Sequence, residues 1–172
     1  MPMKKVLLTI IGIIFWTSGQ TCDCDYIGNF LKTSKWAEVV FIVKVKGHGD
    51  YISLTGAAPS TVSVPLTATF EIIKTIKGNT DKKEIKVFGD NGVLCRPYID
   101  TFKKDKYYIV GLYRCDGKQG YETTDAFYIA GCGEFWIEYN SEDKTVTGLI
   151  KNKKRKPTTM TLEIFEKLLG ES

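Results

Sequence analysis

The stretch TVSVPLTATFEI, residues 61–72, decides the fold class of this chain. Apolar side chains alternate there with hydroxyl-bearing, acidic and proline residues, at Val62, Val64, Leu66, Ala68, Phe70 and Ile72. A period of two residues is typical of a β-strand with one buried face. The sequence therefore predicts one long, half-buried strand. We expect a bend or bulge at Pro65, because proline cannot donate a ladder hydrogen bond.

Further strands are predicted on both sides of this stretch, rich in β-branched and aromatic residues, at 38–47, 84–89, 106–114, 120–130, 134–140 and 145–150. The segment GHGDYISLTGAAPS, residues 47–60, is expected to be a loop. Helical spacing of apolar residues predicts a short helix within 25–36 and another within 158–170. The chain is thus expected to be a mainly antiparallel β-barrel or sandwich, with a small helix at each end.

The first 21 residues indicate export. Lys4 and Lys5 precede an apolar run from Val6 to Trp16, which is shorter than the roughly 20 residues of a membrane-spanning helix and is typical of a signal peptide. Without residues 1–21 the chain keeps 22 basic and 20 acidic residues, a net charge of +2. This charge argues against a nucleic-acid partner. The basic cluster KNKKRKP at 151–157 is expected to be a solvated loop.

The five cysteines of an exported chain are expected to form disulfides. Cys22 and Cys24 are too close for a comfortable mutual bridge, so each should reach a distant partner. The remaining cysteines are Cys95, Cys115 and Cys132, and spacing alone leaves 15 pairings open: five choices of an unpaired cysteine, and three ways of pairing the other four.

Catalytic and metal-dependent functions have little support in the sequence. Structural zinc needs four ligands, commonly in two close pairs, whereas this chain has one close cysteine pair and one histidine, His48. Cys115 and His48 could serve as nucleophile and base, but nothing local brings them together. Glu134 and Glu138 lie in an alternating strand and are expected on a solvated face. We therefore expect a binding protein without a cofactor, and not an enzyme.

The chain carries an ordered set of motifs: CDC at 22–24, WAEVVFIVKVKG at 36–47, ATFEIIKTIKGN at 68–79, Cys95 ahead of DTFKKDKYYIV at 100–110, and Cys132 in YIAGC. Taken together, these motifs resemble those of the netrin-like family, and more narrowly the bacterial relatives of the tissue inhibitors of metalloproteinases. The resemblance covers residues 22–133. It implies an OB-fold-like, five-stranded Greek-key barrel with short flanking helices. It also implies the disulfides Cys22–Cys95 and Cys24–Cys132, with Cys115 as a free thiol.

The resemblance further implies a function for the amino terminus. The animal inhibitors place the α-amine and carbonyl oxygen of their first cysteine on the catalytic zinc of a metalloproteinase. In this chain that residue is Cys22, and Asp23, Cys24 and Asp25 would complete the contact. The loop 47–60 would add to the contact surface. Asp23 stands where the inhibitors have a small hydroxyl residue, and no cysteine follows Cys132.

The position of signal cleavage separates the possible uses of Cys22. Cleavage after Thr21 would give Cys22 a free α-amine, whereas cleavage after Gly19 would leave Gln20 and Thr21 in front of it. A lipid anchor on Cys22 is a third possibility, which is incompatible with both a Cys22 disulfide and a free α-amine.

The expected organisation is a signal peptide at 1–21, an OB-fold domain at 22–140, and a carboxy-terminal part at 141–172. This last part would hold a hairpin or strand, the basic loop and an amphipathic helix, all packed on the same domain. The expected partner is a protein, with a zinc metalloproteinase as the specific hypothesis. A non-inhibitory or envelope-associated interaction module is the alternative.

Overall fold

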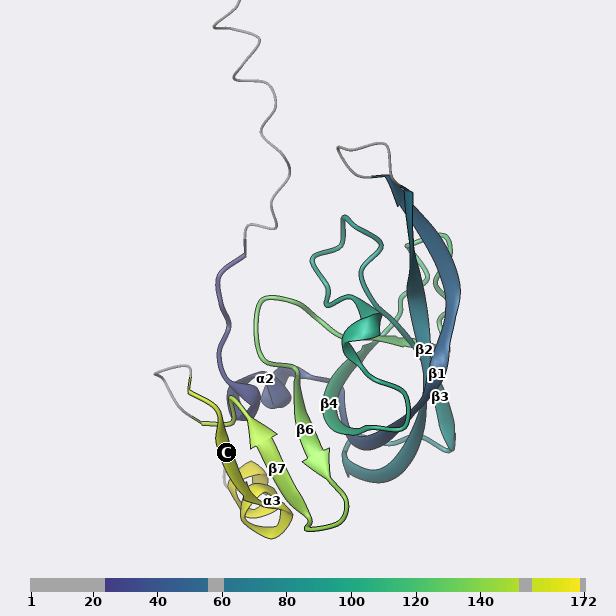
Figure 1. Cartoon of the computed structure of the whole chain (residues 1–172). Helices are drawn as coiled ribbons and strands as arrows, with labels where there is room; N and C mark the ends of the chain where they lie inside the picture. Colours follow the sequence, from purple (N-terminus) through teal and green to yellow (C-terminus); the bar gives the residue numbers. More distant parts are fainter. Residues whose placement is uncertain (1–23, 56–60, 152–155, 171–172) are drawn as a thin grey trace, which may run out of the picture.

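The computed structural model describes residues 24–55, 61–151 and 156–170. The predicted signal peptide at 1–21, together with Cys22 and Asp23, lies outside these residues. The described elements follow one another as α2 (Phe30–Trp36), β1 (Val39–Thr55), β2 (Thr61–Lys77), β3 (Glu84–Phe88), the 3-10 turn η1 (Ile99–Thr101), β4 (Tyr107–Arg114), β5 (Phe127–Tyr128), β6 (Trp136–Asn140), β7 (Thr145–Gly148), β8 (Thr158–Thr161) and α3 (Leu162–Gly170) (Figure 1).

Five strands close into a barrel in the order β1-β2-β3-β5-β4, and β4 pairs back onto β1. All of these pairings are antiparallel except β3 with β5, so the barrel is mixed. Three further strands, β6, β7 and β8, continue the sheet from β4. The predicted OB-fold-like barrel with short helices is therefore confirmed.

The stretch at 61–72 lies inside β2, as its alternation predicts, and the strand continues to Lys77. The irregularities in its pairing lie elsewhere than expected. Pro65 pairs in register with Tyr51, whereas the register between β1 and β2 shifts at three places from Val40 to Gly47. The extra residues at these shifts are Ile76 and Ile73 on β2 and Lys46 on β1, and Pro65 sits in the ladder without a bulge.

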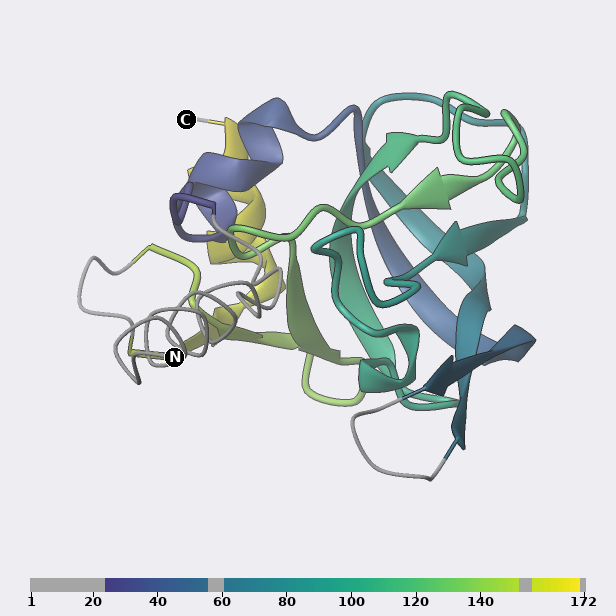
Figure 2. The same cartoon turned by 90° about the horizontal axis from the view of Figure 1, so that it is seen from above.

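The first half of β1 is apolar at consecutive positions because the barrel wall is buried on both faces. Phe41 and Val43 point into the barrel core with Phe70, while Val40 and Ile42 belong to a second core outside the barrel. The second core is closed by both helices and by β6 and β7, and Phe30 of α2 packs on Phe165 of α3 with ring centroids 5.7 Å apart. Figure 2 shows the two helices together on one side of the barrel.

The two helices of the described residues lie within the predicted segments and begin a few residues inside them. Asn29 caps α2, and its side chain accepts a hydrogen bond from the Lys32 amide, so Ile27 lies before the helix. At the other end of the chain, residues 158–161 form strand β8 against β7, and α3 begins only at Leu162. None of the helices in the described part of the chain has the length and apolar character that a membrane crossing requires.

Candidate functional site

Residues 24–29, which we call the strap, run in an extended path from the predicted cleavage region to α2 (Figure 1). A disulfide joins Cys24 to Cys132 across 108 residues of sequence, with Cα atoms 5.8 Å apart. The Ile27 amide donates to the Cys132 carbonyl oxygen at 2.6 Å, and the Glu134 amide donates to the Gly28 carbonyl oxygen at 3.0 Å. The strap backbone is therefore fixed on residues 132–134.

Three consecutive residues of the strap are exposed to solvent. Cys24, Asp25 and Tyr26 are all exposed, and the Tyr26 hydroxyl donates to Glu134 Oε1 at 3.3 Å. Glu134 was predicted to lie on a solvated strand face. It lies just before β6 instead, and its carboxylate helps to hold the strap. A pre-ordered backbone with exposed side chains is suited to contact another macromolecule.

Of the four residues predicted to contact a protease zinc, Cys24 and Asp25 lie in the strap, while Cys22 and Asp23 lie outside the described residues. The disulfide Cys24–Cys132 is the pair that the family resemblance implied. Cys95 is also disulfide-bonded. Its expected partner, Cys22, is not among the described residues, so that pairing stays a prediction.

The loop at 89–98 lies against the strap anchor. A Cβ atom added to Gly131 would overlap the carbonyl oxygen of Cys95, so the two backbones touch immediately before Cys132. Cys95 and Cys132 both adopt left-handed backbone conformations, with φ of 54° and 61°. The buried Asp90 shapes the loop from within, since its Oδ1 accepts from the amides of Gly92 and Leu94 at 2.8 and 3.0 Å.

The predicted loop at 47–60 is largely strand, and that prediction was wrong. β1 continues to Thr55 and pairs with β2 from Thr61 onward, so residues 47–55 and 61–66 form a two-stranded ribbon. Cross-strand pairs such as Ile52 with Val64 and Leu54 with Val62 stabilise the ribbon, although its Gly- and Ser-containing sequence does not indicate a strand. Residues 56–60 of the predicted loop lie outside the described residues.

Polar contacts hold the base of the ribbon to the barrel. Asp50, at the left-handed φ of 47°, pairs with Lys86 and accepts from the Thr67 hydroxyl at 3.0 Å. The hydrogen bond from Lys86 is the main reason that the pKa of Asp50 is lowered. His48 Nε2 lies 2.8 Å from the carbonyl oxygen of Phe102.

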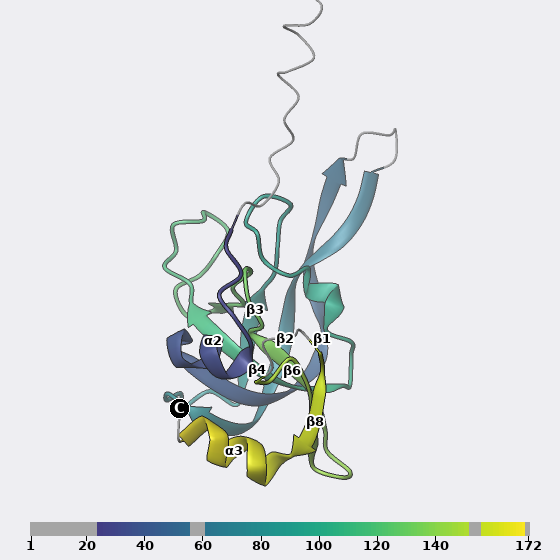
Figure 3. The same ribbon diagram turned by 90° about the vertical axis from the view of Figure 1, so that its left-hand side faces the viewer.

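Strap, loop and ribbon lie at the same end of the barrel in Figures 1 and 3, with the loop between the other two. The methyl carbon Cδ2 of Leu54 in the ribbon would lie 3.2 Å from a Cβ at Gly92 in the loop. We call these three segments together the binding edge. Large apolar side chains are exposed on it, with 63% of Tyr51, 56% of Val62 and 70% of Val93 accessible to solvent.

A buried polar cluster behind the loop had no counterpart in the sequence predictions. Arg96 pairs with Glu122, and its guanidinium carbon lies 4.0 Å from the centroid of the Tyr128 ring. No periodicity or spacing in the sequence points to this pair. The cluster ties the loop at 89–98 to the segment that leads into β5.

The proposed pair of Cys115 and His48 is not brought together. Cys115 is a free, buried thiol that packs with Leu66 and Phe88, whereas His48 faces Phe102. Burial, followed by the nearby Glu122 carboxylate, raises the pKa of Cys115 to about 12. Such a thiol is a poor nucleophile at neutral pH. Within the described residues, no three His, Cys, Asp or Glu side chains cluster in a way that could hold a metal ion.

Comparison with known proteins adds no assignment. Neither the protein-family models nor the curated proteins include a match to this sequence. The fold is therefore established by the strand order, and membership of the netrin-like family stays a prediction from the sequence motifs.

Proposed function

We propose that this protein is an exported, disulfide-bridged binding domain that inhibits a zinc metalloproteinase through its amino terminus. The observation that supports the proposal is the fixed strap. The disulfide from Cys24 to Cys132 and the hydrogen bond from Ile27 to Cys132 hold the chain only two residues after Cys22. A terminus anchored in this way loses little conformational entropy when it enters an active-site cleft.

The inhibitory chemistry would come from Cys22. A catalytic zinc keeps a position open for water, and a neutral α-amine with the adjacent carbonyl oxygen can take that position as a chelate. Asp23 and Asp25 would then face the protease on either side of Cys24. The loop at 89–98 and the ribbon would widen the contact along the binding edge, where Val93 and Tyr51 are exposed.

The proposal is tested with two forms of the protein, one that begins at Cys22 and one with a single alanine before Cys22. We expect stoichiometric inhibition of at least one member of a panel of zinc proteases by the first form and none by the second. Both forms should show the same unfolding transition, and a serine protease serves as the control target. Failure to inhibit any zinc protease, or inhibition that survives the added alanine, would overturn the proposal.

Proton competition provides a second readout of the same chemistry. An α-amine has an ordinary pKa of about 8 and binds zinc only when it is neutral. Inhibition through Cys22 should therefore weaken as the pH falls below about 8, after correction for the protease's own pH profile. Inhibition by the ribbon or loop alone would lack this dependence on the amine.

A non-inhibitory interaction module is the second candidate, and the exposed apolar side chains of the binding edge favour it. In that case the added alanine would change nothing, while Tyr51→Ser combined with Val93→Ser would weaken partner binding. Mass spectrometry of the mature amino terminus separates both candidates from a lipoprotein, because a lipid on Cys22 adds the mass of its acyl chains and excludes a Cys22–Cys95 disulfide.

A further inference from the structure

The sheet formed by β6, β7 and β8 has one apolar face and one polar face. Ile137, Val146 and Met160 turn toward the second core. The alternate positions, which point the other way, include Glu138, Thr147 and Thr159. The strands that cover the second core therefore leave a polar face open.

The polar face is organised in rows across the strands. Tyr108 of β4 pairs with Glu138, Glu138 pairs with Thr147, and Thr147 pairs with Thr159. The hydroxyls of Thr147 and Thr159 are 2.9 Å apart and hydrogen-bonded. One row thus presents a carboxylate beside two hydroxyl groups.

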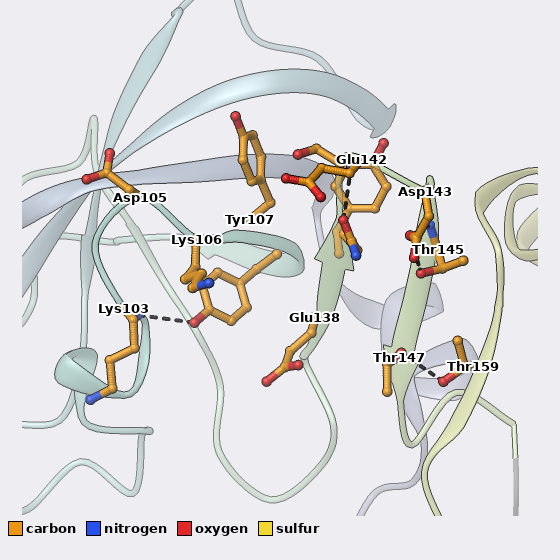
Figure 4. Close-up of a pocket in the computed structure, with 14 residues that line it drawn as sticks. Lys103, Asp105, Lys106, Tyr107, Glu138, Glu142, Asp143, Thr145, Thr147 and Thr159 are labelled. Atoms are coloured by element: carbon orange, nitrogen blue, oxygen red, sulfur yellow. Dashed lines mark hydrogen bonds between the residues drawn. The ribbon is translucent and has the colours of Figure 1, made fainter.

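Two hollows lie over this face and meet at Glu138 and Thr147, which line both of them. The larger has a volume of about 770 Å³ and is bounded by the turn at 103–106 on one side and the turn at 141–143 on the other (Figure 4). The smaller, of about 240 Å³, is lined by Trp136 and Pro157. We call the two hollows together the groove, and the volume of the larger hollow lies within the range of small-molecule sites.

Trp136 gives the groove an aromatic wall. Its ring packs edge-to-face on Phe102 and Tyr108, with centroid distances of 5.2 and 5.9 Å, and the residue remains partly exposed. Trp136 and Glu138 are two residues apart on one strand, so they point to the same face. A fixed indole beside a carboxylate can hold an apolar ring face and the hydroxyl groups at its edge.

Charge and hydrogen-bonding capacity narrow the class of ligand. The larger hollow is lined by two lysines, Lys103 and Lys106, and by four acidic residues, Asp105, Glu138, Glu142 and Asp143. This excess of carboxylates disfavours a polyanion. Among the described residues, the Glu138 carboxylate and the Lys106 ammonium make no intramolecular hydrogen bond or ion pair, so both can bind a ligand.

We propose that this groove binds a neutral oligosaccharide. The sugar hydroxyls would donate to Glu138 and accept from Lys106, the Thr147–Thr159 pair would supply further hydrogen bonds, and one sugar ring would stack on Trp136. The inference goes beyond the inhibitory function, because Glu138, Thr147 and Lys106 are not part of the binding edge.

Titration of the full mature protein with neutral hexasaccharides tests the proposal. The probes are cello-, xylo-, manno- and chitohexaose, and the readout is the indole N–H resonance of Trp136, assigned with Trp136→Phe. We expect saturable shifts with at least one probe. Glu138→Gln should weaken that binding by about tenfold or more, since it removes a charged hydrogen-bond acceptor. Glu163→Gln, on the exposed side of α3, should leave it unchanged.

Two outcomes would overturn the proposal. One is the absence of saturable binding by every neutral probe at millimolar concentration. The other is preferential binding of a heparin hexasaccharide that is lost in Lys106→Met and retained in Glu138→Gln, which would indicate a polyanion site. Because the variants lie on an exposed face, matched amide spectra before titration separate a loss of binding from a loss of fold.

Discussion

Arg96 and Glu122 form an ion pair that is almost completely withdrawn from water, with side chains 10% and 1% exposed. They come from two irregular segments, and the guanidinium also lies over the ring of Tyr128. A buried pair need not stabilise a protein relative to apolar residues, but the loss of one partner leaves an uncompensated charge. The position of the loop at 89–98 therefore depends on both residues.

We predict that Arg96→Met and Glu122→Gln each lower the free energy of unfolding by about 3 kcal/mol or more. The double variant should lose less than the sum of the two, because it leaves no buried charge unpaired. Denaturant unfolding of the four proteins measures the coupling. Lys46→Met, which breaks an exposed pair with Glu71, is the control and should cost no more than about 1 kcal/mol. Additive single effects would contradict the prediction.

The disulfide between Cys24 and Cys132 closes a loop across 108 residues of sequence. On the chain-entropy model, replacing both cysteines by serine should lower the free energy of unfolding by about 3–5 kcal/mol. Unfolding without reductant measures this loss, and amide exchange of Ile27 and Glu134 should show a loosened strap. A loss below about 1 kcal/mol would mean that the hydrogen bonds alone fix the strap.

Gly131 has no room for a side chain, because a Cβ would overlap the Cys95 carbonyl oxygen. The obstacle is backbone, which cannot move aside as a flexible side chain can. Gly131→Ala should therefore lower the free energy of unfolding by about 1–3 kcal/mol. Gly47→Ala is the matched control, since nothing lies within 4 Å of a Cβ there. Equal stabilities of the two variants, measured by thermal unfolding, would refute the close approach.

Lys77 closes the carboxyl end of α2 from a neighbouring strand. Its ammonium group donates to the carbonyl oxygens of Ser34, Lys35 and Ala37 at 3.0, 2.7 and 2.6 Å. Lys77→Met should cost about 1–3 kcal/mol, because these carbonyls lose a charged donor. Faster amide exchange in α2 would report the loss. Lys74→Met, which removes only the surface pair with Glu166, should leave the exchange of α2 unchanged.

Cys115 should make stability depend on alkaline pH. Its pKa rises from 9.0 to about 12 in the folded protein, so the folded state binds the proton more tightly than the unfolded chain. The contribution of this group to stability is fully present below pH 9 and is lost as the pH rises toward 12. Between these values the wild-type protein should lose stability more steeply than Cys115→Ala. Parallel curves for the two proteins would show that the thiol ionises normally.

The barrel could be predicted because the apolar periodicity of its strands is visible within each strand's own sequence. The alternation at 61–72 and the apolar run at 38–47 arise from one and two buried faces, and both are visible without any contact partner. The strand at 47–55 was not predicted, because it is ordered by pairing with residues 61–66. Its glycine, serine and threonine residues do not form a pattern that indicates a strand. For the same reason the short strand Thr158–Thr161 was not predicted; it pairs with β7 just ahead of the predicted helix.

The candidate site was predictable only in part. The close spacing of Cys22 and Cys24 indicated a terminus stapled to distant partners, and the odd number of cysteines indicated one unpaired thiol. Spacing left the pairing open, and only the family resemblance implied it. The pair Arg96–Glu122 could not be foreseen. Its contact joins residues 26 positions apart through irregular backbone, which has no periodicity to read.

The second core has a consequence for where this protein can be divided. Val40 and Ile42 belong to the barrel wall, yet the side chains that shield them from water include Val146, Ile150 and Phe165. A chain ending at Asn140 would contain every barrel strand, but apolar side chains on the outside of the barrel would be exposed to water. The boundary at 140 therefore separates two stretches of sequence but not two autonomous folding units, and a graft of the barrel alone onto another protein would need a substitute for its missing cover.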